Sequence, residues 1–177
     1  MTEATLKTNI YNWLKLIAPT LWVGAGNARP TNTIAYVWHM DENARPATPL
    51  LEGRLSLNSR IGRDMPGSPD INGSQTYTGD REEMLYLTAI GKGSIDLLNT
   101  IRNSIEDTTI RPTISANSFL VVEAQPVMDA HQYLDSMPED RATLDLRIRF
   151  IDTWTTASGK PGVIETAPMP PSNYKVN

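Results

Sequence analysis

Strict alternation of apolar and polar residues defines the clearest element of the chain, at residues 141–151. The apolar set occupies every second position: Ala142, Leu144, Leu146, Ile148 and Phe150. A period of two predicts a β-strand with one buried and one exposed face. The polar positions between them, which include Arg141, Arg147 and Arg149, are expected on the exposed face. An extension of this strand through Trp154 stays open.

Further strands are expected upstream. Residues 82–90 are apolar or aromatic at both odd and even positions, which predicts a central strand covered on both faces. Residues 51–61 alternate in the same way as the first strand, which predicts a half-buried strand. Short apolar runs predict strands at 34–38 and 119–124, the second of them buried, and a last short strand at Val163 and Ile164.

Two segments carry their apolar residues at helical spacing. Residues 2–17 have one apolar face made of Leu6, Ile10, Trp13, Leu14 and Ile17. Pro19 ends this helix. A second helix is expected after Gly91 and Gly93, with Ser94 as its N-cap, since a serine hydroxyl can accept a free backbone N–H of the first turn. Its apolar stripe consists of Leu97, Leu98, Ile101 and Ile105.

The remaining segments read as connections. Residues 62–79 are rich in Gly, Pro, Asp, Asn and Ser, which predicts a long loop, and a loop of this length in a compact domain is usually functional or disordered. Residues 126–138 read as irregular. The fold class expected is α+β: a mixed, largely antiparallel sheet of about five or six strands with two main helices packed on it. It forms one domain, 1–166, followed by an extended Pro-rich arm, 167–177.

The composition of the chain argues against several classes of protein. The 177 residues are 40% hydrophobic and 20% charged, which is ordinary for a globular protein. The net charge of -4 argues against a general nucleic-acid binder. The absence of cysteine excludes disulfides and Cys-ligated metals. The first ten residues lack the apolar region of a signal peptide, and no apolar run reaches the length of a membrane span, so a soluble protein made inside a cell is expected.

Motifs that suggest chemistry are incomplete. The GKGS at 91–94 lies between a strand and a helix, but its lysine precedes the second glycine, unlike a phosphate-binding loop. Asp70, Asn72 and Gly73 resemble part of a calcium loop whose required glutamate position is Arg81. The two histidines, His39 and His131, have no cysteine or nucleophile motif to work with. We therefore expect no catalytic, cofactor-binding or metal-binding residues.

Charged surface rows and the tail are more informative. The arginines at 141, 147 and 149 are balanced locally by Asp140 and Asp145, which favours a solvated face or a subunit contact over phosphate binding. The tail after Ala167 has three prolines that favour an extended backbone. The candidate interface residues are Arg63, Asp64, Asp70, Asp80, Arg81, Arg141, Arg147, Arg149, Met169 and Tyr174.

Several motifs in a fixed order resemble the neck or tail terminator proteins of long-tailed bacteriophages. They are IYNWL at 10–14, NARP at 43–46, LEGRLSLNSRIGRD at 51–64, SPDINGSQTYTGDRE at 68–83, LYLTAIGKGSIDLLNTIRNSI at 85–105, FLVVEAQPVMD at 119–129 and EDRATLDLRIRF at 139–150. The resemblance covers about 10–165. It departs from the family at 18–33, which is an insertion, and after Ala167, where the tail is longer.

The resemblance implies structural work. It implies a six-fold ring that caps the head-proximal end of the tail tube and offers a surface to head-completion proteins. The partners would be other copies of the chain, the tail tube protein and head–tail connector or adaptor proteins, with the sheath protein as a further candidate. DNA would only pass through the ring lumen, and there would be no membrane partner. The protein would be made in the host bacterial cytoplasm and reside in the virion.

Three alternatives stay open. The chain could be a head–tail adaptor or another neck ring, which the sequence does not separate from a terminator. It could be a small-molecule enzyme with residues 62–79 as a lid, although an enzyme should show convergent polar groups around a pocket. Nucleic-acid binding is opposed by the acidic balance.

Overall fold

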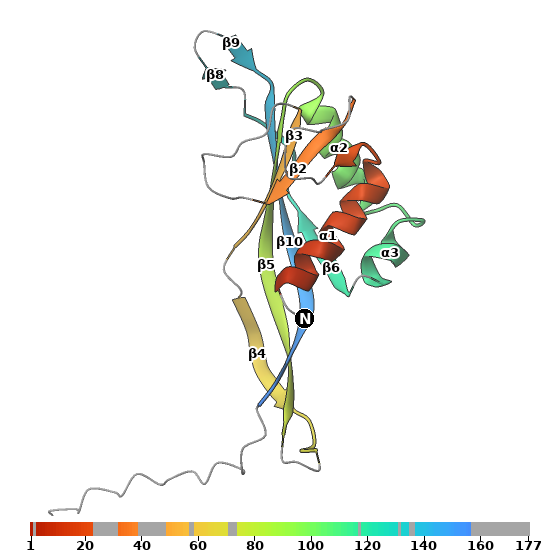
Figure 1. Cartoon of the computed structure of the whole chain (residues 1–177), viewed down its shortest axis with the longest axis vertical. Helices are drawn as coiled ribbons and strands as arrows, with labels where there is room; N and C mark the ends of the chain where they lie inside the picture. The colour runs from red at the N-terminus through yellow and green to blue at the C-terminus, as the bar shows by residue number, and fades with distance from the viewer. Residues whose placement is uncertain are drawn as a thin grey trace, which may run out of the picture.

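Two long antiparallel strands form the axis of the molecule. The computed structural model describes residues 1, 3–22, 32–38, 49–56, 59–70, 74–116, 118–130, 132–134 and 137–156. Strands β5 (Thr76–Ile90) and β10 (Arg141–Thr155) are each 15 residues long and pair along their whole length, from Arg141 opposite Ile90 to Thr155 opposite Thr76. Figure 1 shows this pair running along most of the long axis of the molecule, with the β8–β9 hairpin beyond its upper end.

The other described strands are arranged around this pair. The main order is β1-β2-β3-β5-β10-β6, where β4 also pairs with β5 and β7 with β10. The β1–β2 and β2–β3 pairs are parallel and the others are antiparallel. The bounds are β1 (Leu21–Trp22), β2 (Ile34–Trp38), β3 (Leu50–Leu55), β4 (Ser59–Pro66), β6 (Phe119–Ala124) and β7 (Met128–Asp129), with a separate hairpin of β8 (Gln132–Leu134) and β9 (Met137–Glu139).

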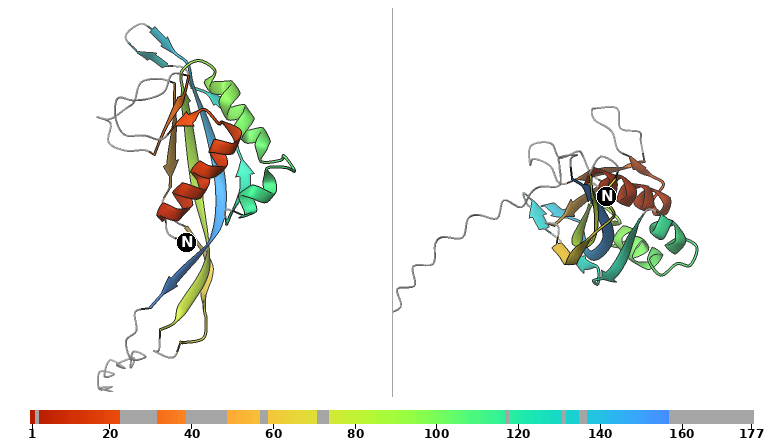
Figure 2. Two further views of the ribbon diagram at one scale, coloured as in Figure 1. Left: turned by 45° about the vertical axis from the view of Figure 1, so that its right-hand side comes forward. Right: turned by 90° about the horizontal axis from the view of Figure 1, so that it is seen from below.

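The helices cover one face of the sheet. They are α1 (Glu3–Ile17), α2 (Ser94–Ser104) and α3 (Arg111–Ala116). Figure 2 shows all three on the same side. The core between helices and sheet includes Leu6, Ile10, Trp13, Leu14, Leu85, Leu87, Leu98, Ile101, Leu144 and Leu146. The expected α+β class, with a mixed and largely antiparallel sheet, is confirmed, and the eight-stranded sheet has somewhat more strands than expected.

The strand faces follow the sequence pattern with one correction. In β10 the five alternating apolar residues are buried, and the strand does extend through Trp154. In β5, Leu85, Leu87 and Ala89 are buried, but the opposite face is not covered as expected, since Tyr86 is 37% exposed. The strand is central because β3 and β10 flank it, while the helices pack on one face only. A strand that is central in the hydrogen-bond ladder can therefore still present one face to solvent.

The segment 51–79 was wrongly divided by the sequence pattern. One strand was expected at 51–61 and a loop at 62–79, but β3 ends at Leu55 and the separate strand β4 occupies Ser59–Pro66. β4 pairs with the first part of β5, with a register shift between Ile61 and Met65. Gly62 in this shift has φ +73, a conformation that favours glycine. The composition of residues 62–79 is typical of a loop, yet part of it forms a polar hairpin. Strands that pack on no core need no alternation of apolar residues, so the sequence pattern does not reveal them.

Smaller differences from the expected structure concern the beginning of α2, the position of β6 at the sheet edge and the segment 126–138. Gly93 in the left-handed conformation is the N-cap of α2, and Ser94 is its first, buried residue. Strand β6 has the expected bounds, but it is an edge strand with Leu120 and Val122 exposed. The segment 126–138 contains β7, β8 and the beginning of β9. The expected strand at 163–164 and the tail 167–177 lie outside the described residues.

A buried carboxylate, that of Glu83, lies on the helix-covered face of β5. Glu83 is 6% exposed, and its Oε2 has no hydrogen-bond partner among the described residues. Burial raises the pKa of Glu83, and the nearby Glu3 raises it further, while Lys7 opposes both. Met1, Leu55, Ser56 and Phe150 line the same cavity, together with Glu3 and Arg54. The carboxyl group therefore binds its proton more tightly in the folded protein than in the unfolded chain.

A raised pKa at Glu83 makes stability fall as the pH rises. Above the ordinary value of 4.5 the unfolded chain releases this proton while the folded protein retains it, so the free energy of unfolding decreases as the pH rises. We predict that Glu83→Gln stabilises the protein at pH 7.5 by about 1 kcal/mol, equivalent to roughly 2–4 °C in Tm. At pH 4 the benefit should vanish, because the wild-type carboxyl is then protonated. Thermal unfolding between pH 4 and 8 measures both effects.

The matched control is Glu82→Gln, one residue earlier on the opposite face of β5. Glu82 contacts Arg147 and Arg149, so this change should leave Tm unchanged or slightly lower at pH 7.5. If Glu83→Gln unfolds at a lower temperature than wild type at pH 7.5, Glu83 is a favourably paired ion and the account of its burial is wrong.

Candidate interaction site on the outer sheet face and the ribbon

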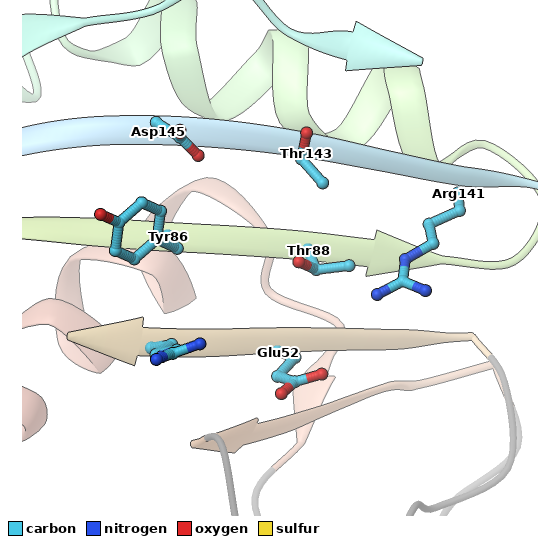
Figure 3. A pocket seen from close by; sticks show the side chains of 7 residues that line it. Glu52, Tyr86, Thr88, Arg141, Thr143 and Asp145 are labelled. Atoms are coloured by element: carbon cyan, nitrogen blue, oxygen red, sulfur yellow. The ribbon is translucent and has the colours of Figure 1, made fainter. Parts of the chain in front are cut away.

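The outer face of the sheet, opposite the helices, is polar and shallow. Its depression of about 410 Å³ is lined by Glu52, Arg54, Tyr86, Thr88, Arg141, Thr143 and Asp145. Figure 3 shows the labelled side chains coming from three adjacent strands. Two acidic and two basic residues share this surface with hydroxyl groups, which suits hydrogen bonds and ion pairs with another protein. In the described part of the chain, no group of three or more His, Cys, Asp or Glu residues could hold a metal ion.

The exposed arginines continue along the same face. Arg147 forms an ion pair with Glu82 at 3.3 Å and a second one with Glu123 of β6, while Arg149 lies 4.0 Å from Glu82. Exposed pairs of this kind contribute about 0–1 kcal/mol each. These glutamates, and not only the Asp140 and Asp145 identified from the sequence, compensate the arginine charge. The cross-strand register brings them together, since Arg149 lies opposite Glu82.

Beyond the helices the sheet continues as a three-stranded projection, which we call the ribbon. It consists of β4 together with residues 76–82 of β5 and 149–155 of β10. Figure 1 shows it extending away from the helical body. Without helices on it, the ribbon exposes large apolar side chains: Met65 is 72% exposed, Ile151 56% and Trp154 44%. Such residues on a protruding element are candidates for contact with another protein.

A buried ion pair holds the three strands of the ribbon together. Arg81 Nη1 donates to Asp64 Oδ1 at 2.8 Å and Nη2 donates to Oδ2 at 3.3 Å. Asp152 of β10 lies 3.6 Å from Arg81 Nε, and the Trp154 indole donates to Asp64 Oδ2 at 3.3 Å. The pKa of Arg81 is raised, chiefly by its hydrogen bond with Asp64. A bidentate, charge-assisted pair of this geometry fixes the orientation of both side chains.

Gly79 makes room for this pair. A Cβ atom at this position would overlap Asp64 Oδ1 and lie 2.6 Å from Arg81 Nη1. A larger residue here would force the ends of the Asp64 and Arg81 side chains to move, so glycine serves close approach and not an unusual backbone angle. Its place opposite Asp152 in the β5–β10 register puts it at the centre of the network.

The structure distributes the predicted interface residues over three environments. Asp64 and Arg81 are buried and bind each other, whereas Arg63, Asp70 and Asp80 are exposed on or near the ribbon. Arg141 lines the outer-face depression, and Arg147 and Arg149 lie exposed on the same face. Met169 and Tyr174 lie outside the described residues. The exposed set therefore remains the candidate for contact, and the buried pair shapes the surface that carries it.

Sequence reasoning missed the aromatic pair of the ribbon. Tyr77 and Trp154 stack with ring centroids 4.3 Å apart and planes 7° from parallel. They lie opposite each other in the β5–β10 register, which the sequence alone does not supply. The signal that could have found them is the extension of the 141–151 alternation through Trp154.

We predict that Gly79→Ala destabilises the protein by about 1–3 kcal/mol, the usual cost of overpacking. The methyl group would force Asp64 and Arg81 apart within the ribbon. Chemical denaturation measures the change in unfolding free energy. Asp80→Asn, one residue on and exposed, is the control and should change it by less than about 0.5 kcal/mol. Equal stability of Gly79→Ala and wild type would contradict the close packing at Gly79.

Comparison with known protein families identifies the family to which the chain belongs. A family model described as phage neck terminator protein matches residues 4–175. No curated protein matches the chain significantly. Among the described residues no helix is long and apolar enough to cross a membrane. Because the match spans nearly all of the 177 residues, including both faces of the sheet and the ribbon, the chain belongs to the phage neck terminator protein family.

Proposed function

We propose that the protein is a tail terminator, in which six copies form a ring that caps the head-proximal end of the phage tail tube. The observation that carries this proposal is membership of the phage neck terminator family, which gives the protein a structural role in the neck of the virion. In this role the ring stops tube growth and offers a surface to the head-completion and connector proteins. The partners proposed are thus other copies of the chain, the tail tube protein and the connector or adaptor proteins, with the sheath protein as a further candidate.

Two surfaces support self-association. The outer sheet face combines both signs of charge within a shallow depression, so it can meet a neighbour through ion pairs and hydrogen bonds. The ribbon adds exposed apolar side chains on an element held rigid by the Asp64–Arg81 pair. A rigid projection loses little conformational entropy when it docks on a neighbour. Both features suit a protein that functions by binding to neighbouring subunits.

The proposed role is structural and not catalytic. The family description supports this, because it names a neck component. The outer-face depression is open, and its side chains are those of ordinary ion pairs. The net charge of -4 suits a ring through which DNA passes without being held. We propose no cofactor.

A phage that lacks the protein tests the proposed function. We predict that infected cells then accumulate heads separate from tails, with tail tubes of uncontrolled length, because nothing caps the growing tube. Electron microscopy of lysates gives tail lengths and the fraction of joined particles. Wild-type protein supplied from a plasmid should restore both.

A charge-reversal pair sharpens this test. Arg149→Glu, on the outer sheet face, should fail to restore joining, since it places like charge beside Glu82 and changes the sign of the proposed contact. Arg111→Glu, exposed on α3 on the helical side, is the matched control and should restore joining. Joined particles with normal tails in the absence of the protein would contradict the proposed function. If Arg149→Glu restores head–tail joining, the outer sheet face is not part of the proposed subunit contact.

A further inference from the structure

A groove at the end of the ribbon has the chemistry of a peptide-binding site. It has a volume of about 340 Å³ and is lined by Arg63, Asp64, Pro66, Gln75, Tyr77 and Trp154. The Tyr77 and Trp154 rings are stacked face to face, and Trp154 is still 44% exposed. The folded chain thus presents a large aromatic surface to solvent at a place where no helix packs.

The two rings are held in position from both sides. The Trp154 indole donates to Asp64 Oδ2 at 3.3 Å, and Asp64 is itself fixed by Arg81. The Tyr77 hydroxyl donates to Gln75 Oε1 at 3.1 Å, and the Gln75 side-chain amide donates to the Gly67 carbonyl at 2.9 Å. Aromatic rings fixed in advance lose little entropy on binding, and aromatic-lined grooves with hydrogen-bonding rims characteristically take proline-rich segments.

The chain itself carries such a segment. Residues 167–177, APMPPSNYKVN, contain Pro168, Pro170 and Pro171, which favour an extended backbone with little freedom to lose. β10 ends at Thr155, next to Trp154 of the groove, so the described part of the chain ends beside the groove and not on the helical body. The 21 residues from 157 to 177 could span roughly 70 Å when fully extended, enough to leave their own molecule.

We propose that the ribbon groove binds the proline-rich tail, residues 167–177, of a second copy of this chain. The inference deepens the proposed ring, because it names the segment and the site through which adjacent copies lock together. Prolines of the tail stack on the exposed face of the Tyr77–Trp154 pair, and the Gln75 amide and Arg63 guanidinium donate hydrogen bonds to tail carbonyls at the rim. If the tail of each copy binds the groove of its neighbour, every copy in the ring is linked to the next.

Cysteine pairs test the site directly, because the full-length chain contains no cysteine. One preparation carries Arg63→Cys in the groove and another, distinguished by an affinity tag, carries Asn173→Cys in the tail. We expect a disulfide-linked heterodimer when the two are mixed under mild oxidation. A third preparation with Arg111→Cys on α3 is the control, and it should cross-link to the tail only at the random level.

Three outcomes would overturn the proposal. They are equal cross-linking to Arg63→Cys and Arg111→Cys, no cross-linking to either, and an intrachain disulfide as the main product of the Arg63→Cys, Asn173→Cys double variant. The last outcome would assign the groove to the tail of the same molecule. Circular dichroism first establishes that each variant is folded.

A peptide titration then tests the aromatic pair and does not depend on ring formation. A synthetic peptide of residues 167–177 is added to full-length protein whose own Pro168, Pro170 and Pro171 are replaced by alanine. We expect a saturable shift of the Trp154 indole N–H resonance. Calorimetric titration, which does not depend on this resonance, should show about tenfold or greater loss of affinity with Trp154→Ala, the size typical of a tryptophan that anchors an interface. The same peptide with alanine at the three prolines is the control.

Equal binding of the alanine peptide, or no binding at millimolar concentration, would remove proline recognition from this groove. Either result would leave the proposed ring untouched, since copies could still meet through the outer sheet face. Conversely, a particle without six-fold rings would contradict the proposed function while tail binding in the titration stood.

Discussion

The continuous pairing of β5 with β10 is the constraint on which the rest of the structure depends. Over its helix-covered half, the pair presents Leu85, Leu87, Leu144 and Leu146 to the helices, and the hydrophobic effect holds that half in place. Over the ribbon half there are no helices, so the same two strands need another source of order. The buried Asp64–Arg81 pair fixes β4 against β5. Asp152 contacts Arg81, and Trp154 donates a hydrogen bond to Asp64, which connects β10 to the same pair.

This division explains how one sheet can serve two purposes. The helical half is an ordinary two-layer domain, with the interior on one side of the sheet and a polar face on the other. The ribbon half projects from it and exposes apolar and aromatic side chains without collapsing, because a charged network fixes its strands. The bidentate geometry of the Asp64–Arg81 pair fixes both side chains, so this network is a local constraint on the three strands. A rigid projection beside a polar face is well suited to joining copies of one protein into an assembly.

The parts of the fold that could be predicted from the sequence are those in which burial imposes a period. The α1 stripe and the alternation in β10 were predicted correctly because each packs against one side of the core. The ribbon hairpin was not, since its residues pack on no core and leave only turn-like composition. The open outer face of β5 was missed for a related reason: Tyr86 is apolar enough to suggest burial, yet it lies where no helix packs.

The candidate site was predictable only in part. The exposed arginines were identified from their alternation, but their partners Glu82 and Glu123 depend on cross-strand register. The role of Gly79 depends on a contact with Asp64, 15 residues earlier in the chain, which no local pattern reports. The aromatic pair likewise joins Tyr77 to Trp154, which are opposite each other near one end of the β5–β10 ladder but far apart in the sequence. Pairings between distant strands therefore carry the information that the sequence pattern lacks.

We propose that this phage neck protein closes the tail as a ring of identical copies. A reconstruction of the neck from intact phage particles by electron cryomicroscopy measures this most directly, if symmetry is determined from the data and not imposed. The account predicts six copies in one ring seated on the head-proximal end of the tail tube, with adjacent copies in contact. A ring of different symmetry, a single copy, or density for this protein away from the end of the tube would contradict it.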